Sequence, residues 1–242
     1  MSVGLKVLAV VPARAGSKGI IRKNLAKLHG RTLIDYACST ATQCPSVSRT
    51  VITSDDRHMG AEGVRSGADH FVERPECLAT DSATGADVWV HAWLAAEQEF
   101  GRLFDVSVLL QPTSPTRSIE DVEATIHRLL VTGATAALTV SRAPKHFSPA
   151  KLLWMDDDGK LAPVIPDVIP NRRRQDVPNA YWLNGHCYAV TRNPFMRDRV
   201  VIPTDAQAVV IDRQVANIDG PEDLRWAERL LDPQLLRQSD VR

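Results

Sequence analysis

The chain has 242 residues and carries 29 basic and 29 acidic side chains, so its formal net charge is zero. This balance argues against a general nucleic-acid binder, which has a basic surface. With 44% hydrophobic and 24% charged residues, the composition is that of a globular protein and excludes a disordered chain. The apolar runs fall short of the roughly 18 residues of a membrane helix. The four cysteines lack metal-binding spacing, so we expect reduced thiols, no membrane contact and a cytoplasmic location.

Short apolar runs that predict strands alternate along the chain with helical patterns. In chain order they are Val7–Val11 (strand), Thr32–Thr42 (helix), Thr50–Thr53 (strand), Arg57–Ser66 (helix), His70–Val72 (strand), Ala86–Phe100 (helix), Val106–Leu110 (strand), Ser118–Val131 (helix), Ala136–Val140, Cys187–Val190 and Ala208–Ile211 (strands) and Pro221–Leu231 (helix). Such alternation predicts an α/β fold with a mainly parallel sheet covered by helices on both faces.

The alternation is interrupted between residues 142 and 180. Six prolines and the turn signal Asp156-Asp157-Asp158-Gly159 fall in this stretch. Turn residues of this kind favour a hairpin over a further layer of the sheet. We therefore expect a single domain over residues 1–242 with a projecting arm at about 142–180.

The loop 12–24 after the first strand is the strongest functional signal. Its two glycines, Gly16 and Gly19, allow sharp turns, and it has no acid but four cations: Arg14, Lys18, Arg22 and Lys23. Backbone amides beside such cations form a cradle for a polyanion such as a triphosphate. A Walker A loop and a dinucleotide fingerprint are both excluded, because the glycines are wrongly placed for either. The alternative is a solvated basic loop.

Several segments in the same order resemble one known family. Pro12-Ala13-Arg14-Ala15-Gly16-Ser17-Lys18-Gly19, followed by Lys23-Asn24-Leu25, is similar to the signature loop of the acylneuraminate cytidylyltransferases, or CMP-sialic acid synthetases. The other similar segments are Arg74-Pro75-Glu76 with Leu78-Ala79-Thr80-Asp81, Leu109-Leu110-Gln111-Pro112-Thr113-Ser114-Pro115 with Arg117, Arg173-Arg174-Gln175-Asp176, Asn184-Gly185, and Ile218-Asp219 with Asp223-Leu224.

This resemblance implies a three-layer nucleotidyltransferase fold whose projecting arm forms a homodimer. It also implies an enzyme that transfers CMP from CTP to the anomeric hydroxyl of a sialic-acid-like 2-keto sugar acid and releases pyrophosphate. Mg²⁺ is the implied cofactor. The implied partners are CTP and a small-molecule acid acceptor.

The resemblance also assigns roles to residues. Catalysis falls to Arg174, Lys18 and Lys23. Nucleotide binding falls to Arg14, Gly16, Ser17, Lys18, Lys23, Asn24, Arg74, Thr84 and Thr113. Acceptor binding falls to Gln111, Arg174 and Asn184, and metal binding to Asp219 and Asn217. Gln111 also follows a predicted strand, which places its amide at the ligand edge of the sheet.

Some of these residues have competing interpretations. Asp219 also suits a helix cap, because Glu222 follows three residues later. The stretch Thr53-Ser54-Asp55-Asp56 either faces the nucleotide or metal or caps the next helix, and we favour capping. Ser118 is expected to cap a helix, and Trp89 with Trp93 to pack in the core.

The chain also departs from the family at three places. Ala83 and Gly85 stand where serines are usual. Asn217 and Trp182 stand where an aspartate and an arginine are usual. These departures leave open a cytidylyltransferase for another acceptor, such as an octulosonate, a phosphonate or a cyclitol phosphate. They also leave open a non-catalytic nucleotide-binding protein of the same fold.

Overall fold

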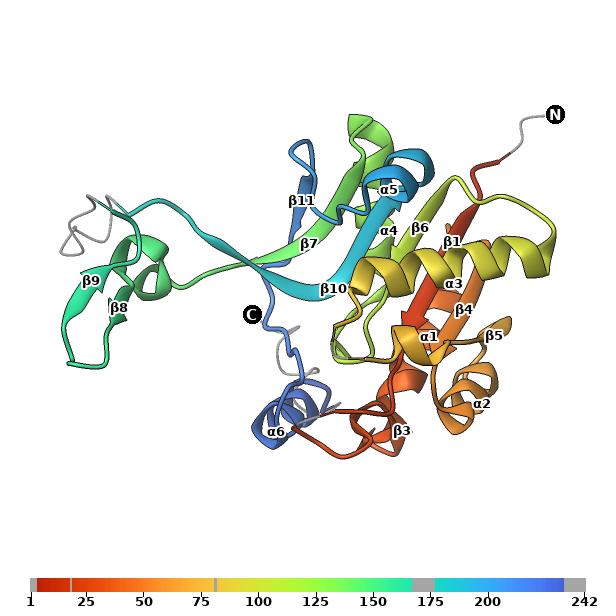
Figure 1. Ribbon diagram of the computed structural model, residues 1–242, viewed down its shortest axis with the longest axis horizontal. Helices are drawn as coiled ribbons and strands as arrows, with labels where there is room; N and C mark the ends of the chain where they lie inside the picture. The colour runs from red at the N-terminus through yellow and green to blue at the C-terminus, as the bar shows by residue number, and fades with distance from the viewer. Residues whose placement is uncertain (1–3, 18, 81, 167–176, 233–242) are drawn as a thin grey trace.

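The structure is a computed structural model that describes residues 4–17, 19–80, 82–166 and 177–232 (Figure 1). Its centre is a seven-stranded sheet in the order β11-β7-β10-β6-β1-β4-β5. The strands are β1 (Val7–Pro12), β4 (Arg49–Ser54), β5 (His70–Glu73), β6 (Val106–Leu109), β7 (Ala136–Arg142), β10 (Tyr181–Thr191) and β11 (Gln207–Val210). Only β10 runs antiparallel to its neighbours, β6 and β7, within this described sheet. The mainly parallel sheet predicted from the sequence is therefore confirmed.

Helices cover both faces of the sheet and make three layers (Figure 1). Residues of α1 (Leu33–Gln43), α2 (Arg57–Arg65) and α4 (Ile119–Thr132) pack in one core cluster, and those of α3 (Gly85–Phe100) and α5 (Arg192–Asp198) in the other. Strand β1 supplies both clusters in alternation, because successive strand residues face opposite sides. Trp89 and Trp93 of α3 are fully buried, as predicted. The three-layer α/β fold is thus confirmed.

The parallel strands of the described sheet run in the same direction, so their carboxyl ends lie at one edge of the sheet. This is the edge at which a ligand is expected. Strand β10 is longer than the predicted Cys187–Val190, since it begins at Tyr181. Its pairing with β7 shifts register between Leu183 and Tyr188, which marks a bulge. The Asn184-Gly185 pair lies in this bulge, within the strand and not in a loop between elements.

A hairpin extends away from the sheet between β7 and β10 (Figure 1). It follows two short 3₁₀ turns, η3 (Lys145–Phe147) and η4 (Pro149–Lys151), and pairs β8 (Leu153–Met155) with β9 (Leu161–Pro163) in antiparallel register. All six residues of these two strands are exposed. This part of the chain therefore packs little against the rest of the protein.

A third, smaller core cluster joins an early segment of the chain to a late one. It contains Leu28 of β2 (Lys27–Leu28), which pairs with β3 (Arg31–Thr32), and Ala227 of α6 (Pro221–Leu230). Two further 3₁₀ turns, η1 (Lys23–Leu25) and η2 (Glu76–Leu78), complete the described elements. Ile218, which precedes α6, is fully buried in the same cluster. This packing brings the segment before α6 against the loop that follows β1.

The four cysteines are free, and burial raises the pKa of the Cys38 and Cys187 thiols to about 12, which keeps them protonated. Among the described residues, no helix has both the length and the hydropathy that crossing a bilayer requires.

Candidate active site

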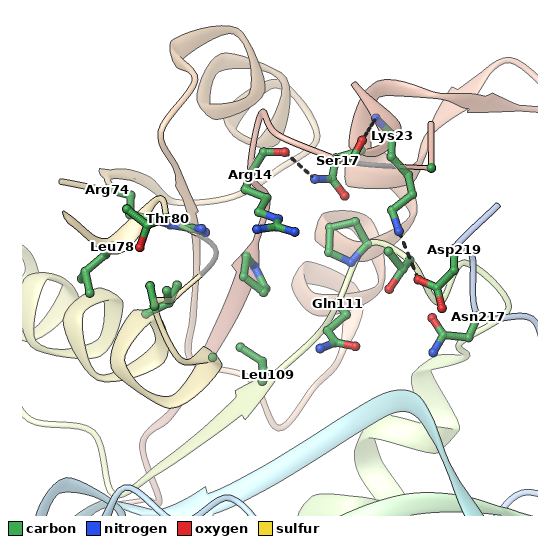
Figure 2. Close-up of a pocket in the computed structure, with 18 residues that line it drawn as sticks. Arg14, Ser17, Lys23, Arg74, Leu78, Thr80, Leu109, Gln111, Asn217 and Asp219 are labelled. Atoms are coloured by element: carbon green, nitrogen blue, oxygen red, sulfur yellow. Dashed lines mark hydrogen bonds and ion pairs between the residues drawn. The ribbon is translucent and has the colours of Figure 1, made fainter. Parts of the chain in front are cut away.

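A cavity of about 720 Å³ lies at the carboxyl ends of β1 and β6 (Figure 2). Ligands of open α/β sheets bind at this edge, and the volume suits a nucleotide-sized ligand. The lining comes from the loop after β1, the stretch from β5 into α3, the loop after β6 and the segment before α6: Pro12, Arg14, Ser17, Gly19, Lys23, Asn24, Arg74, Leu78, Thr80, Ala83, Gly85, Val88, Leu109, Gln111, Pro112, Thr113, Asn217 and Asp219.

Two aspartates that follow β4 hold the basic loop in place. The Ala15 N–H donates to Asp55 Oδ1 at 2.9 Å. Arg22 has a left-handed backbone (φ 52°), and its guanidinium pairs with Asp56 at 2.7 Å. Asp56 also caps α2, which confirms the capping predicted for the stretch 53–56. The loop therefore rests on the neighbouring strand end and is not a freely solvated segment.

Polar side chains within the loop set its shape. The Asn24 amide donates to the Arg14 carbonyl oxygen at 3.0 Å, and Asn24 is only 6% exposed. The Ser17 hydroxyl accepts from the Lys23 N–H at 3.4 Å and donates to the Ile20 carbonyl oxygen. Ser17 and Asn24 thus brace the loop while also lining the cavity (Figure 2).

The described lining is rich in positive charge. It contains three cationic side chains, Arg14, Lys23 and Arg74, against one carboxylate, Asp219. The Lys23 ammonium donates to the Ile218 carbonyl oxygen at 2.7 Å and pairs with Asp219 Oδ1 at 3.3 Å. Because the Asp219 side chain is 86% exposed, this pair is weak. The cavity therefore presents a net positive field that favours a polyanion.

Arg74 is a buried cation at one side of the cavity. It is 7% exposed, and its guanidinium donates to the Thr53 carbonyl oxygen at 3.0 Å. Burial lowers its pKa, Asp55 opposes that effect, and the positive charge of Arg14 adds to it. Its Nε has no hydrogen-bond partner among the described residues. The concentrated charge of Arg74 and Arg14 is what an anionic ligand would relieve.

Gln111 leaves the end of β6 in a fixed orientation. Its carbonyl oxygen accepts from Arg117 Nη2 at 2.6 Å, and the same buried guanidinium donates to the carbonyl oxygens of Gly185 and His186. Gly185 has φ 73°, and a Cβ there would lie 3.2 Å from Gln111 Oε1 and 2.8 Å from Ser114 Oγ. Glycine in the β10 bulge therefore leaves room for the Gln111 amide.

The segment before α6 forms the wall opposite Arg74 (Figure 2). The Ile218 N–H donates to the Thr113 carbonyl oxygen at 2.8 Å, which attaches this segment to the loop after β6. On its other side it touches the basic loop, since a Cβ on Gly19 would overlap the Asp219 carbonyl oxygen. Asn217 and Asp219 are thereby placed in the lining beside Gln111 and Lys23.

The Asp219 side chain does not cap α6. The cap is Gly220, and Asp223 accepts from the backbone N–H of Asp219 at 2.9 Å and of Gly220 at 2.8 Å. The alternative interpretation of Asp219 as a helix cap is therefore wrong. Its carboxylate stays on the cavity side, where it meets Lys23.

The wall formed by the segment before α6 carries two oxygen donors of the kind that Mg²⁺ requires. Asn217 and Asp219 offer an amide and a carboxylate oxygen in the same lining. No group of three or more His, Cys, Asp or Glu side chains gathers for a metal among the described residues. Mg²⁺ commonly uses one or two carboxylates and takes its other ligands from water and phosphate. The residues therefore fit a cation shared with a ligand's phosphates.

Most predicted site residues lie together in the lining, but three described ones do not. Gly16 is outside the lining. Thr84 caps α3, where its hydroxyl donates to Asp87 Oδ2 at 2.7 Å. Asn184 is fully buried, and its amide oxygen accepts from Thr139 Oγ1 at 2.6 Å. Asn184 thus lies in the sheet beneath the site. Lys18 and Arg174 lie outside the described residues.

Sequence reasoning gave no role to the apolar side of the cavity. Leu78, Val88 and Leu109 line it, with Thr80 and Ala83 nearby. Such a surface suits the flat face of a base or sugar. The detectable signal was Leu109, because the last residue of a strand that ends at the ligand edge often faces the ligand.

Comparison with known proteins places this chain in a family. Residues 8–205 match the family model described as cytidylyltransferase. The CMP-N,N'-diacetyllegionaminic acid synthase of Legionella pneumophila is 29% identical over 94% of this chain and 97% of its own length. The pseudaminic acid cytidylyltransferase of Campylobacter jejuni is 24% identical over 93% and 96%. The N-acylneuraminate cytidylyltransferase of Escherichia coli is 29% identical over 92% of this chain, which spans 51% of that relative.

Solved structures agree on the fold. A CMP:2-keto-3-deoxy-manno-octonic acid synthetase complexed with CTP matches 95% of this chain and 99% of its own, with TM-score 0.71 and 16% identity. A 4-diphosphocytidyl-2C-methyl-D-erythritol synthase from Anaerococcus prevotii matches 94% and 96%, with TM-score 0.61 and 14% identity. Given the family match over residues 8–205 and a cationic cavity at the ligand edge of the sheet, the chain belongs to the cytidylyltransferases, as a nucleotidyltransferase enzyme of the sialic-acid type that its motifs resemble.

Proposed function

We propose that this protein transfers CMP from CTP to the anomeric hydroxyl of a sialic-acid-like 2-keto sugar acid and releases pyrophosphate. The observation that carries the proposal is the cavity itself, whose described lining combines three cations with three side-chain amides and a single carboxylate. In this reaction the sugar hydroxyl attacks the α-phosphorus, and negative charge grows on the departing pyrophosphate. Cations held in place before the reaction stabilise that charge without further reorganisation.

The residues of the cavity divide into two groups by chemistry. Arg14 and Lys23, on the loop after β1, are suited to the phosphates, since both are anchored by that loop's internal contacts. Gln111 both donates and accepts hydrogen bonds, which suits hydroxyl groups of ribose or acceptor. Lys18 is assigned to the phosphates and Arg174 to the acceptor only because the motifs that contain them resemble those of the family.

Asn217 and Asp219 are the residues that would hold Mg²⁺ together with the phosphates of CTP. When bound, the cation would neutralise charge on the phosphates during transfer. Lys23 would then lose its pairing with Asp219 Oδ1, now 3.3 Å away, and turn to the phosphates. The same ammonium thus has two alternative anionic partners.

We also propose that the protein acts as a homodimer whose contact is the arm. The β8–β9 hairpin exposes large apolar side chains, with Trp154 66%, Met155 72% and Leu161 57% exposed. Such a patch on an extended hairpin is typical of a surface that another chain covers. Light scattering of the wild type and of a Trp154→Ser, Met155→Ser variant tests this. A dimeric wild type and a monomeric variant are expected, and a monomeric wild type would contradict it.

The reaction is tested by pyrophosphate release. The purified protein is incubated with CTP, UTP, ATP or GTP and a panel of 2-keto sugar acids that includes neuraminic, legionaminic and pseudaminic acids, with and without Mg²⁺. We expect release with CTP and one or more of these acids. No release across the panel, together with no CTP binding by calorimetry, would refute the proposal.

A second candidate changes only the acceptor. Asn217 is neutral, and Trp182 is 39% exposed where β10 leaves the arm. The acceptor side therefore differs in charge from the family pattern, while the loop after β1 keeps it. Comparing sialic-type acids with octulosonates, phosphonates and cyclitol phosphates at one CTP concentration separates the two candidates.

A further inference from the structure

A buried polar network runs beneath the wall of the cavity that carries Gln111. The His186 ring lies 3.0 Å from Asp121 Oδ2 through Nδ1 and 3.1 Å from Thr116 Oγ1 through Nε2. His186 is fully buried and Asp121 is 3% exposed. Asp121 and Ser118 also form the capping box of α4. The network therefore fixes the start of α4 against the bulge of β10.

Arg213 joins this network from the opposite wall. Its Nη1 donates to Asp121 Oδ1 at 2.8 Å, and its Nη2 donates to Asp121 Oδ2 and, at 3.1 Å, to the Thr116 carbonyl oxygen. The Arg213 side chain is 44% exposed, against 3% for Asp121. A planar guanidinium is suited to such a fork, because it binds a carboxylate and a carbonyl oxygen together.

The network attaches the segment 213–219 to the loop after β6 at three places. First, Arg213 donates to the Thr116 carbonyl oxygen. Second, the Ala216 N–H donates to Thr116 Oγ1 at 3.0 Å. Third, the Ile218 N–H donates to the Thr113 carbonyl oxygen. Asn217 lies between the last two. A Cβ on Gly185 would be 3.2 Å from Gln111 Oε1 and 3.5 Å from Asn217 Nδ2, so the amides of the two walls meet above this glycine.

We propose that Arg213 is a positioning residue, which holds the Asn217–Asp219 wall at the correct distance from Gln111. This inference rests on the proposed function, because the spacing matters for bringing acceptor, metal and phosphates together. Arg213 is absent from the cavity lining and acts only through Asp121 and Thr116. Displacement of a reacting group by about 1 Å costs on the order of 100-fold in rate.

The test compares Arg213→Met and Arg213→Lys with Arg225→Met. Arg225 is the matched control, since it is exposed on nearby α6 and pairs only weakly, at 3.5 Å, with exposed Glu222. Hydrogen exchange of peptides covering 213–219, the urea unfolding curve, the CTP dissociation constant and kcat per folded molecule are measured for each.

For Arg213→Met we expect faster exchange in 213–219 and a roughly 10- to 100-fold lower kcat. CTP affinity measured without Mg²⁺ should change by less than about threefold, because Arg14 and Arg74 stand on other segments and the metal ligands Asn217 and Asp219 are then not engaged. Arg213→Lys should give exchange rates and kcat between those of the wild type and Arg213→Met, because an ammonium keeps the charge but cannot bind the carboxylate and the carbonyl oxygen together. Arg225→Met should match the wild type in every measurement.

Two results would overturn the proposal. One is exchange in 213–219 that stays at the wild-type rate in Arg213→Met. The other is a kcat per folded molecule within twofold of the wild type, which would reduce Arg213 to a role in stability. Hydrogen exchange is measured without catalysis. It therefore shows whether Arg213 holds the segment 213–219 even if the pyrophosphate assay refutes the proposed reaction.

Discussion

Substitution of Lys23 by methionine separates binding from stability in one experiment. Lys23 is 15% exposed, and its ammonium donates to the Ile218 carbonyl oxygen and pairs with Asp219. Methionine has a similar length and fills the same space without the charge. The loop should keep its shape, because the Asn24 bond to the Arg14 carbonyl oxygen and the Asp55 bond to Ala15 do not involve Lys23.

The two effects differ in size. The partner carboxylate is 86% exposed, so the ion pair is worth about 0–1 kcal/mol to folding. A hydrogen bond from an ammonium to a phosphate is worth about 1.5–3 kcal/mol, or roughly a 10- to 150-fold change in dissociation constant. We therefore expect Lys23→Met to weaken CTP binding strongly and to change the free energy of unfolding by about 1 kcal/mol.

Calorimetric titration with CTP and urea unfolding measure these two quantities on the same samples. Lys27→Met is the control, because Lys27 is an exposed lysine on β2 that lies outside the cavity lining. It removes the same charge from the protein without touching the site. A CTP dissociation constant for Lys23→Met within threefold of that for Lys27→Met would refute the assignment of Lys23 to the phosphates.

Three further predictions follow from the same geometry. Asn217→Asp adds a second carboxylate beside Asp219, so the protein should bind Mn²⁺ without nucleotide more tightly than the wild type, measured by electron paramagnetic resonance. Gly19→Ala forces a Cβ onto the Asp219 carbonyl oxygen, so CTP should bind at least about 10-fold more weakly, measured by calorimetry. Burial opposes the charged form of Asp121, but the hydrogen bond from His186 and other donors holds its pKa below the usual value. This stabilisation is complete above about pH 4 and is lost as pH falls further, so Asp121→Asn should flatten the acid limb of the unfolding midpoint.

Local sequence patterns were enough for the layers and for the basic loop. Apolar runs such as Val7–Val11 are buried on both faces, so their composition alone identifies them as strands of a covered sheet. The capping signal of Ser118 with Asp121 is equally local, and the structure has the full capping box. The loop after β1 then follows from its position, because ligands meet a parallel sheet at its carboxyl edge.

Contacts between distant segments could not be read from the sequence. Asn184 was expected to bind the acceptor, but the bulge in β10 contains this residue and buries its amide against Thr139. Arg213 carried no signal, since its partner Asp121 lies 92 residues earlier. Such pairs form only when the sheet order is set, which apolar periodicity does not specify.

The two sides of the cavity depend on the fold in different ways. The phosphate side is built within one strand-loop unit and its neighbour, through pairs such as Ala15 with Asp55 that lie 40 residues apart. The opposite side needs β10, the segment before α6 and the Arg213 network, whose partners are 92 to 97 residues apart. Two of the three departures from the family pattern, Trp182 and Asn217, occur in these later segments. The late segments do contact the loop after β1, through Lys23 and the Ile218 carbonyl oxygen. Their side chains can still change while the Ala15–Asp55 pair that holds this loop is kept, so acceptor preference can diverge in this fold with less effect on the phosphate side.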